Sequence, residues 1–410
     1  MNYESDEELH IPVEVVGIVL WWLRNDKATL FKCLMVCRAW AEEAKRAIWW
    51  NPPVSELANL TYERRREYTR YVQRLEFTPR DRNHHHQFRR LYFPKLEHFR
   101  ASHPSPGSGG ALPFGQYMQN KLKSFEMVGV GRTQEDILDT LVAKCKRLEH
   151  IEIGFQLSHR LSHQRLEEFF RRKSRSLKSI KFTHILGIDN GLGVDLFRYL
   201  AFHNGLERLD IGGFMHYTLI RPIVDMPEPI FASLRCLSVH LETRSLPRLT
   251  GRMMNVPTFT ELNVTLDVDN TNPFPYLNQL TNLTVLRTIP ITGGSWAAED
   301  FMGLQDLRKL RVFKLSTIVA PILVTRYSDF NFIDSFGQKP DLEDLIFEVN
   351  CPLTTLTLNF LGRHCPRLQR CYLPIQIFEE VYAIWKRVKA PLFPRLTQLE
   401  IGGLSYGVSL

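Results

Sequence analysis

Apolar residues recur along most of the chain in a six-residue pattern: one apolar residue, two variable residues, a second apolar residue, one variable residue and a third apolar residue. Copies begin at residues 72, 96, 122, 148, 177, 206, 234, 259, 280, 310, 342, 368 and 396. The twelve steps between these starts average 27 residues, a period typical of leucine-rich repeats. The second half of each copy alternates as a strand does. The pattern therefore predicts about thirteen short strands.

Several copies are preceded by a segment with the apolar spacing of a helix, as at 133–147, 163–176, 194–205 and 353–367. One strand and one helix per repeat predict an α/β solenoid, a horseshoe with a parallel inner sheet and outer helices, because no single repeat can bury its own apolar side. The solenoid is expected to span 72–410 as about thirteen irregular repeats. Prolines exclude long helices from 212–233 and 265–340, where the repeat register is left open.

A different pattern occupies the N-terminal segment 9–50. Pro12 suits the start of a helix, and the apolar face that follows contains Val15, Val16, Val19, Leu20 and Leu23. A second run with helical spacing extends from Thr29 to Ala47, which predicts a bundle of two or three short helices. About fifty residues with so many large apolar side chains cannot cover all of them internally. A partner is therefore expected here.

This segment resembles an F-box. The family pattern runs LPxE, then aliphatic residues at helical spacing, a turn bearing Leu, VCRxW and a closing Trp. Its counterparts are Ile11 in place of the usual Leu, then Pro12, Glu14, Val15, Val16, Val19, Leu20, Leu23, Leu30, Cys33, Val36, Cys37, Arg38, Trp40 and Trp49. The predicted organisation is a flexible acidic N-terminus at 1–8, an all-α F-box at 9–55, a linker helix at 56–71 and the solenoid.

The resemblance implies that the chain is the substrate-recognition subunit of a Skp/cullin/F-box ubiquitin ligase, in which the F-box binds a Skp-type adaptor and, through it, a cullin. Segments 145–153 and 365–373 look like the cysteine-containing leucine-rich repeats that often follow F-boxes. The chain itself would perform no bond chemistry; it would hold a target for proteasomal degradation. The adaptor-binding residues that the resemblance implies are Ile11, Pro12, Val15, Val16, Val19, Leu20, Leu23, Leu30, Leu34, Val36, Cys37, Trp40 and Trp49.

The concave face of the solenoid is expected to bind the target protein. By strand alternation, residues between and just after the apolar positions point to this face, and the candidate target-binding residues are Asp210, His240, Asn263, Lys314, Ile346, Tyr372 and Glu400. They mix both charges with aromatic and aliphatic side chains. Such a surface suits a protein or peptide ligand better than a polyanion.

Charge and cysteine content narrow the class of protein. The first sixty residues hold six basic and nine acidic residues, a net of −3, which leaves +11 on 61–410. That positive charge is low for a nucleic-acid-binding protein of this length. Three hypotheses stay open: the ligase subunit first, a non-ligase F-box scaffold second and a nucleic-acid-binding solenoid third. Seven scattered cysteines form no disulfide framework, and no apolar run is long enough to span a bilayer. We expect a cytoplasmic or nuclear protein that does not enter a membrane.

No motif for catalysis, metal binding or cofactor binding stands out. Nucleophile elbows, HExxH and dinucleotide fingerprints are absent from the sequence. The run His84–His86 is predicted to be a polar loop, since consecutive side chains diverge on a regular backbone. The glycine-rich segment 102–115 lacks the GxxxxGK pattern of a phosphate loop and is predicted to be a flexible loop. The sequence thus predicts a non-catalytic protein without metal or cofactor.

Overall fold

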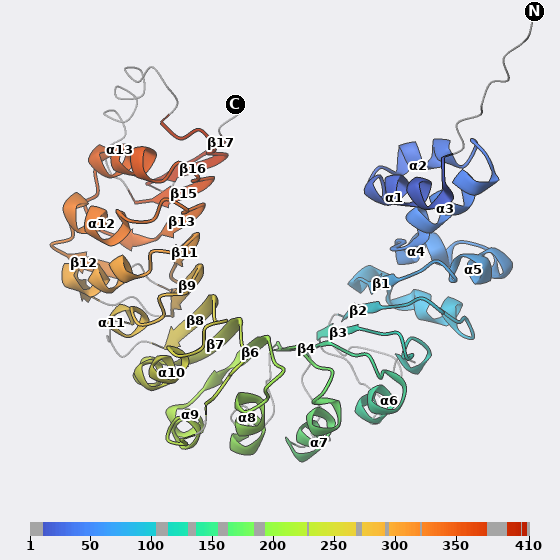
Figure 1. The fold of residues 1–410 in the computed structure, drawn as a ribbon, viewed down its shortest axis with the longest axis horizontal. Coiled ribbons are helices and arrows are strands. Elements are labelled where there is room, and N and C mark those ends of the chain that lie inside the picture. The colour runs from blue at the N-terminus through green and yellow to red at the C-terminus, as the bar shows by residue number, and fades with distance from the viewer. Residues whose placement is uncertain are drawn as a thin grey trace, which may run out of the picture. The chain divides into compact units, whose positions relative to one another are not determined.

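A computed structural model of the chain (Figure 1) describes residues 11–103, 114–129, 137–154, 163–183, 193–227, 229–267, 273–291, 295–319, 322–374, 392–402 and 404–407. The chain divides into two compact units, Met1–Gln156 and Leu157–Leu410. This division falls inside the predicted solenoid 72–410, between its fourth and fifth strands. The predicted acidic N-terminus at 1–8 lies outside the described residues, as do residues 104–113 of the predicted glycine-rich loop.

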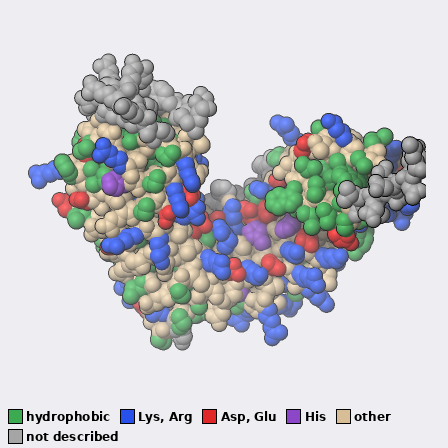
Figure 2. All heavy atoms as spheres, turned by 45° about the horizontal axis from the view of Figure 1, so that its top comes forward, with side chains coloured by type: hydrophobic (Ala, Val, Ile, Leu, Met, Phe, Trp, Pro, Cys, Tyr) green, Lys and Arg blue, Asp and Glu red, His purple; other side chains and the backbone are tan. Residues whose placement is uncertain are grey.

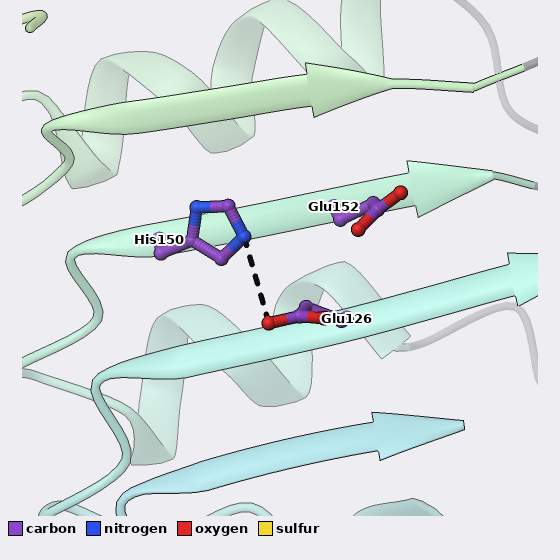
Figure 3. Close-up of side chains that lie close together, drawn as sticks. All are labelled: Glu126, His150 and Glu152. Carbon is purple, nitrogen blue, oxygen red and sulfur yellow. Dashed lines mark ion pairs between the residues drawn. The ribbon is translucent and has the colours of Figure 1, made fainter. Parts of the chain in front are cut away.

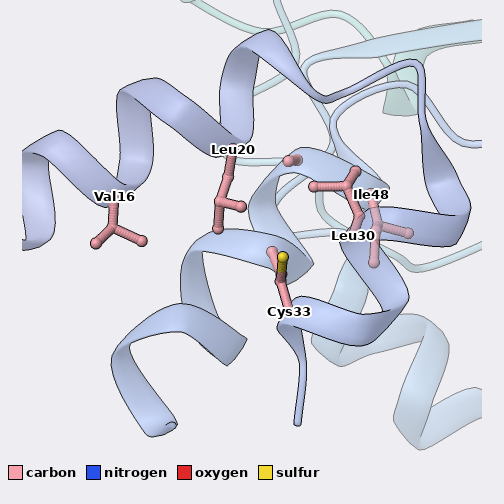
Figure 4. Packing of buried hydrophobic residues seen from close by; sticks show 7 residues of the cluster. Val16, Leu20, Leu30, Cys33 and Ile48 are labelled. Carbon is pink, nitrogen blue, oxygen red and sulfur yellow. The ribbon is translucent and has the colours of Figure 1, made fainter. Parts of the chain in front are cut away.

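The first unit begins with three short helices, α1 (Val13–Trp22), α2 (Lys27–Cys33) and α3 (Arg38–Trp49), as the apolar pattern predicts. Pro12 precedes α1, and the Asp26 carboxylate begins α2 by accepting hydrogen bonds from the backbone N–H and the hydroxyl of Thr29 at 3.1 and 2.7 Å. These bonds hold the pKa of Asp26 below its ordinary value. The helices share a core of their own (Figure 4), made of Val16, Leu20, Leu30, Cys33, Ala44, Ala47 and Ile48.

The predicted linker helix at 56–71 is two helices instead of one, α4 (Val54–Ala58) and α5 (Tyr62–Tyr68). The Arg65 guanidinium donates hydrogen bonds to the carbonyls of Ala58 and Leu60, at 3.0 and 2.7 Å, so it satisfies backbone groups at the break between the helices. Arg65 is therefore a structural residue, whereas the neighbouring Arg64 and Arg66 are exposed.

Four parallel strands follow in the first unit, in the order β1 (Arg74–Phe77), β2 (His98–His103), β3 (Ser124–Gly129) and β4 (His150–Gly154). They are connected by the 3₁₀ helices η1 (Pro79–Phe88) and η2 (Phe114–Gln116) and by α6 (Ile137–Lys144). The predicted polar loop at His84–His86 is wrong, because these residues belong to η1. His85 is buried there, stacked on Phe77 with ring centroids 3.9 Å apart, and its Nδ1 lies 3.3 Å from the Tyr117 hydroxyl.

The second unit repeats the same strand-and-helix plan. Its main sheet has the order β5-β6-β7-β8-β9-β11-β13-β15-β16-β17, parallel except for β17, which pairs antiparallel with β16. The strands are β5 (Ser179–Phe182), β6 (Arg208–Met215), β7 (Cys236–Glu242), β8 (Glu261–Asp267), β9 (Val285–Pro290), β11 (Val312–Leu315), β13 (Asp344–Phe347), β15 (Arg370–Leu373), β16 (Gln398–Ile401) and β17 (Leu404–Gly407).

In each unit the described helices between the strands lie along one face of the sheet; the opposite face, here called the open face, carries none of the described helices (Figure 1). The helical elements are α7 (His163–Lys173), α8 (Val194–Ala201), α9 (Tyr217–Val224), η3 (Thr243–Ser245), α10 (Leu246–Met253), α11 (Phe274–Leu277), η4 (Ala298–Asp306), α12 (Asp329–Phe336) and α13 (Thr355–His364). A second small sheet pairs β10 (Ser295–Ala297), β12 (Ile322–Thr325) and β14 (Val349–Asn350).

Both units are therefore built as an α/β solenoid of the leucine-rich-repeat kind, which confirms the predicted fold class. Each predicted repeat contributes a parallel strand, and the second and third apolar positions of a repeat point to the helical side. In β8, for example, Leu262, Val264 and Leu266 are buried while the residues between them are half-buried. Helices remain short where prolines occur, as in the eight-residue α9, which contains Pro222.

The structure fixes the register of one repeat in 265–340, where the sequence left it open, and it differs from that of the copy given at 280. The copy placed at 280 begins at 283, because Leu286 of β9 is the register partner of Leu262 in β8 and of Phe313 in β11. The distances from the start of this copy to the starts of the preceding and following copies are then 24 and 27 residues, in place of 21 and 30. The third apolar position of this repeat is filled by Thr288, which is fully buried. Because a polar residue fills a core position, the true copy does not match the apolar pattern, whereas the segment that begins three residues earlier does match it.

A buried lysine in the second unit predicts a measurable dependence of stability on pH. Lys339 is fully buried, and its Nζ donates to the carbonyls of Leu304 and Ser335 at 2.8 and 2.7 Å. Burial lowers the pKa of Lys339 to about 8. Between about pH 8 and 10.5 the unfolded chain therefore binds more protons here than the folded one, so the free energy of unfolding is expected to rise with pH, by about 3 kcal/mol from this group.

Urea unfolding of the native chain and of Lys339→Met, measured at intervals from pH 7.5 to 10.5, checks this expectation. The native chain is expected to gain stability relative to the variant as pH rises through this range, since other titrating groups contribute equally to both proteins. Parallel stability profiles would contradict the assignment of a depressed pKa to Lys339.

Candidate functional site

Helix α1 carries apolar side chains on two opposite faces. Val16 and Leu20 on one face are buried in the three-helix core. Val15, Ile18 and Trp22 recur at helical spacing on the other face, where Ile18 is 59% and Trp22 78% exposed, and the exposed Ile11 lies just before the helix. A helix that is apolar all round is normally buried on all sides, so the exposed face of α1 is a candidate binding surface.

Large apolar side chains from α2 and from the turn before α3 are also exposed. Figure 2 shows hydrophobic side chains gathered over these N-terminal helices. We call the set the N-terminal apolar surface, made of Ile11, Val13, Val15, Ile18, Val19, Trp21, Trp22, Phe31, Met35 and Val36. Exposed apolar residues at this density are characteristic of a protein–protein interface.

The structure corrects part of the predicted adaptor-binding set. Val16, Leu20 and Leu30 are at most 2% exposed and belong to the core of the three helices, so this structure does not present them on the surface. Leu23, Leu34, Trp40 and Trp49 are partly buried against that core. The predicted residues that are exposed, and so available to a partner, are Ile11, Pro12, Val15, Val19, Val36 and Cys37.

Several exposed residues were missed by the sequence prediction. They include Val13, Ile18, Trp21, Trp22, Phe31 and Met35. The spacing of Ile18 and Trp22, four residues apart and in step with Ile11 and Val15, was a usable signal for a second apolar face. The family pattern included residues of the buried face in the predicted binding set instead. Both faces carry aliphatic residues, so the pattern does not distinguish the buried face from the exposed one.

Trp21, the residue before the last residue of α1, is held in place by neighbouring side chains. The ring of Trp21 packs edge-on against Trp50, with centroids 5.2 Å apart, and the Arg24 guanidinium carbon lies 4.9 Å from the Trp21 centroid. Arg24 also donates a hydrogen bond to the Trp21 carbonyl at 3.0 Å. These contacts fix the end of the helix from which Trp22 projects, so the exposed surface is presented on a rigid element.

The open face of the second unit brings most of the predicted target-binding residues into one line. Cross-strand register pairs run from β6 to β16 without a gap, and the row consists of Asp210, Ser238, Asn263, Arg287, Lys314, Ile346, Tyr372 and Glu400. Six of the seven predicted residues belong to this row. His240 lies two residues farther along β7, next to Phe214, with ring centroids 4.8 Å apart. Arg287 was missed because its repeat was assigned the wrong register.

Ion pairs join neighbouring strands across this face. Arg287 Nη1 lies 2.8 Å from both Glu261 Oε1 and Asn263 Oδ1, and Lys314 Nζ lies 2.8 Å from Asp344 Oδ2. Burial alone would raise the pKa of Glu261, but hydrogen bonds from Arg287 and Asn263 outweigh it and hold that pKa below its ordinary value. Acidic and basic side chains are interspersed in Figure 2, which is unlike the continuous basic surface of a nucleic-acid-binding protein.

In the described part of the chain, one group of side chains has the composition of a metal site. Glu126 of β3 and His150 and Glu152 of β4 offer ligand atoms that all lie within 4.8 Å of one another (Figure 3). The sequence predicted no metal site. Their proximity depends on the register of two strands 26 residues apart, which a spacing search within one segment cannot detect.

The described helices include none that is long and apolar enough to cross a membrane.

No protein-family model matches the chain, and no curated protein matches it. Among solved structures, the chain is similar to a chain of the Rad7 and Elc1 complex from yeast, with 16% identity and a TM-score of 0.47 over 96% of this chain and 93% of that one. It is also similar to a chain of the TLR13–ssRNA13 complex, with 14% identity and a TM-score of 0.37 over 75% of this chain and 46% of that one. At these identities the comparisons concern the fold alone.

Proposed function

We propose that this chain is the substrate-recognition subunit of a Skp/cullin/F-box-type ubiquitin ligase. The observation that carries the proposal is the N-terminal apolar surface, which stands on a three-helix core in the segment that resembles an F-box. In this proposal the surface binds a Skp-type adaptor, the adaptor brings a cullin, and the open face of the second unit binds a target protein.

The division of apolar residues within α1–α3 supports adaptor binding. The core of the three helices is made of other residues, and Ile18, Trp22 and Phe31 lie outside it and are exposed. Leaving them in water is unfavourable by about 1.5–3 kcal/mol for each large apolar side chain, relative to full burial. A partner with an apolar groove removes that cost. The VCRxW motif at Val36–Trp40 and the closing Trp49 make a Skp-type adaptor the partner expected from the family resemblance.

The open face of the second unit suits a folded protein or a peptide as target. Its central row offers in succession an acid, small polar residues, two bases, and then Ile346, Tyr372 and Glu400. Burial together with Glu348 and Glu400 raises the pKa of Tyr372, so its hydroxyl remains a neutral donor over the physiological pH range. The chain would then act by holding the target near the ubiquitin-loaded enzyme, which is catalysis by proximity.

Assembly from purified components tests this proposal. The full-length chain is expected to elute with a Skp-type adaptor in a stable complex, and a cullin is expected to join only when the adaptor is present. Failure to retain the adaptor would refute the proposal at its first step. Retention of the adaptor without recruitment of a cullin would instead support the alternative, a scaffold that uses the F-box outside any ligase.

The target side needs a separate measurement. Deleting residues 1–50 is expected to leave target binding intact but to prevent its degradation, so proteins captured through the second unit should accumulate in cells that express the shortened chain. Proteins that bind equally well to a chain with Tyr372→Ala and Lys314→Ala are not held by the open face, and their accumulation would not support the proposal.

A further inference from the structure

Two carboxylates face each other on the open face of the first unit. Glu126 and Glu152 are direct register partners on the neighbouring strands β3 and β4. In the row they belong to, Glu76, Arg100 and Glu126 alternate in sign, and Glu152 breaks the alternation. Like charges at directly opposed positions of a sheet repel, so a cation between Glu126 and Glu152 would stabilise the pair.

A histidine completes the group. His150 precedes Glu152 by two residues on β4, so both side chains point to the same face, and His150 Nε2 lies 3.7 Å from Glu126 Oε1 (Figure 3). Glu152 is 6% exposed, whereas His150 and Glu126 are half-buried. One imidazole nitrogen and two carboxylates therefore converge from a rigid sheet, with one side of the group open to solvent.

Both oxygens of Glu126 contact residues outside the group. Arg100 Nε lies 3.6 Å from Glu126 Oε2, and the Ser124 hydroxyl donates to Glu126 Oε1 at 3.0 Å. An outer hydrogen bond such as that from Ser124 orients a ligating carboxylate in metal sites. Arg100 is also shared with Glu76, since its Nε lies 3.6 Å from Glu76 Oε1, so its charge is divided between two carboxylates.

The distances suit a small divalent ion. Ligands at about 2.1 Å from a tetrahedral Zn²⁺ are about 3.4 Å apart, close to the 3.7 Å between His150 and Glu126. The widest separation in the group is within 4.8 Å, so binding an ion would require the ligand atoms to move closer together. One nitrogen and two oxygen donors favour a first-row transition-metal ion over Mg²⁺ or Ca²⁺, which take oxygen ligands.

We propose that Glu126, His150 and Glu152 bind one divalent transition-metal ion, Zn²⁺ fitting best, with a remaining coordination position open on the sheet face. The ion would tie β3 to β4 and neutralise the opposed carboxylates. Three protein ligands and an open position would also let a carboxylate, imidazole or thiolate of a bound protein complete the coordination. This proposal is independent of the ligase function, since it concerns the first unit's sheet alone.

Titration of the full-length chain, stripped with a chelator, tests the site with Co²⁺ as a spectroscopic probe and Zn²⁺ as competitor. One Co²⁺ per chain is expected, with visible absorption that Zn²⁺ removes. His150→Ala and Glu152→Gln should each weaken binding by at least about tenfold, since loss of a ligand exceeds loss of an outer hydrogen bond. His98→Ala is the matched control, because His98 lies in the same cross-strand row as His150 but two strands away, and it should leave binding unchanged.

Thermal unfolding supplies a second readout that does not depend on the spectrum. Zn²⁺ should raise the melting temperature of the native chain and of His98→Ala but not that of His150→Ala or Glu152→Gln. The proposal is overturned if the native chain shows neither Co²⁺ absorption nor stabilisation by Zn²⁺. It is equally overturned if the control loses as much affinity as the ligand variants, since the binding would then come from other histidines.

Discussion

Ile18→Asp is expected to abolish retention of a Skp-type adaptor while helices α1–α3 stay folded. Ile18 lies at the centre of the exposed face of α1 and is 59% exposed, so an aspartate there remains solvated in the free chain. In a complex the carboxylate would be buried without a partner, and the apolar contact of the isoleucine would be lost. Removal of a central anchor typically costs about 2 kcal/mol or more, so we expect affinity to fall about 30-fold or more, measured by titration calorimetry.

Two further variants serve as controls for this experiment. Ile318→Asp makes the same substitution at a residue that is 65% exposed in the second unit, and it should leave adaptor binding unchanged. Leu20→Asp lies on the same helix as Ile18 but places the charge at a fully buried position, so it should unfold the three helices, as circular dichroism would show. Unchanged binding by Ile18→Asp would show that the adaptor uses another surface.

The contrast between Ile18 and Leu20 shows what the sequence could and could not predict at the N-terminus. The presence of short helices in this segment follows from apolar spacing. Apolar spacing does not predict which of the two faces of α1 is buried, because both faces carry aliphatic residues. That choice depends on where α3 packs, which is a tertiary contact without a local signal.

The solenoid was predictable for a different reason. Thirteen copies of one pattern average out local irregularity, so the fold class and the strand positions followed from the repeat period. The failures are single positions where tertiary context overrides the pattern: the buried Thr288 displaced one register by three residues, and the aromatic neighbours of His85 bury a residue predicted to be in a polar loop. The Glu126–His150–Glu152 group required the cross-strand register itself.

Asp329→Ala is expected to be among the most destabilising single substitutions in the second unit. Asp329 begins α12, is almost fully buried and joins that helix to the start of α13. Its carboxylate accepts hydrogen bonds from the Thr354 backbone N–H and hydroxyl, at 3.0 and 2.7 Å, and from the Thr357 hydroxyl. Alanine leaves three donors without this acceptor, that of Thr357 buried and the two of Thr354 half-buried, so we expect the free energy of unfolding in urea to fall by about 3 kcal/mol.

The same contacts fix how this loss depends on pH. Burial alone would raise the pKa of Asp329, but the hydrogen bonds from Thr357 and Thr354 outweigh it and lower the pKa below its ordinary value of 3.8. The stabilisation is therefore fully present above about pH 4 and is lost as pH falls through the lower pKa of the folded chain. The stability difference between the native chain and Asp329→Ala should accordingly be constant from pH 5 to 7 and shrink below pH 4.

Asp334→Ala is the matched control, since Asp334 is exposed on the same helix and should cost little at any pH. Equal destabilisation by the two alanine variants would mean that the loss comes from helix α12 in general and not from the bond to α13. A stability difference that grows below pH 4 would mean that the carboxyl is protonated more readily in the folded chain, contrary to its three hydrogen-bond donors.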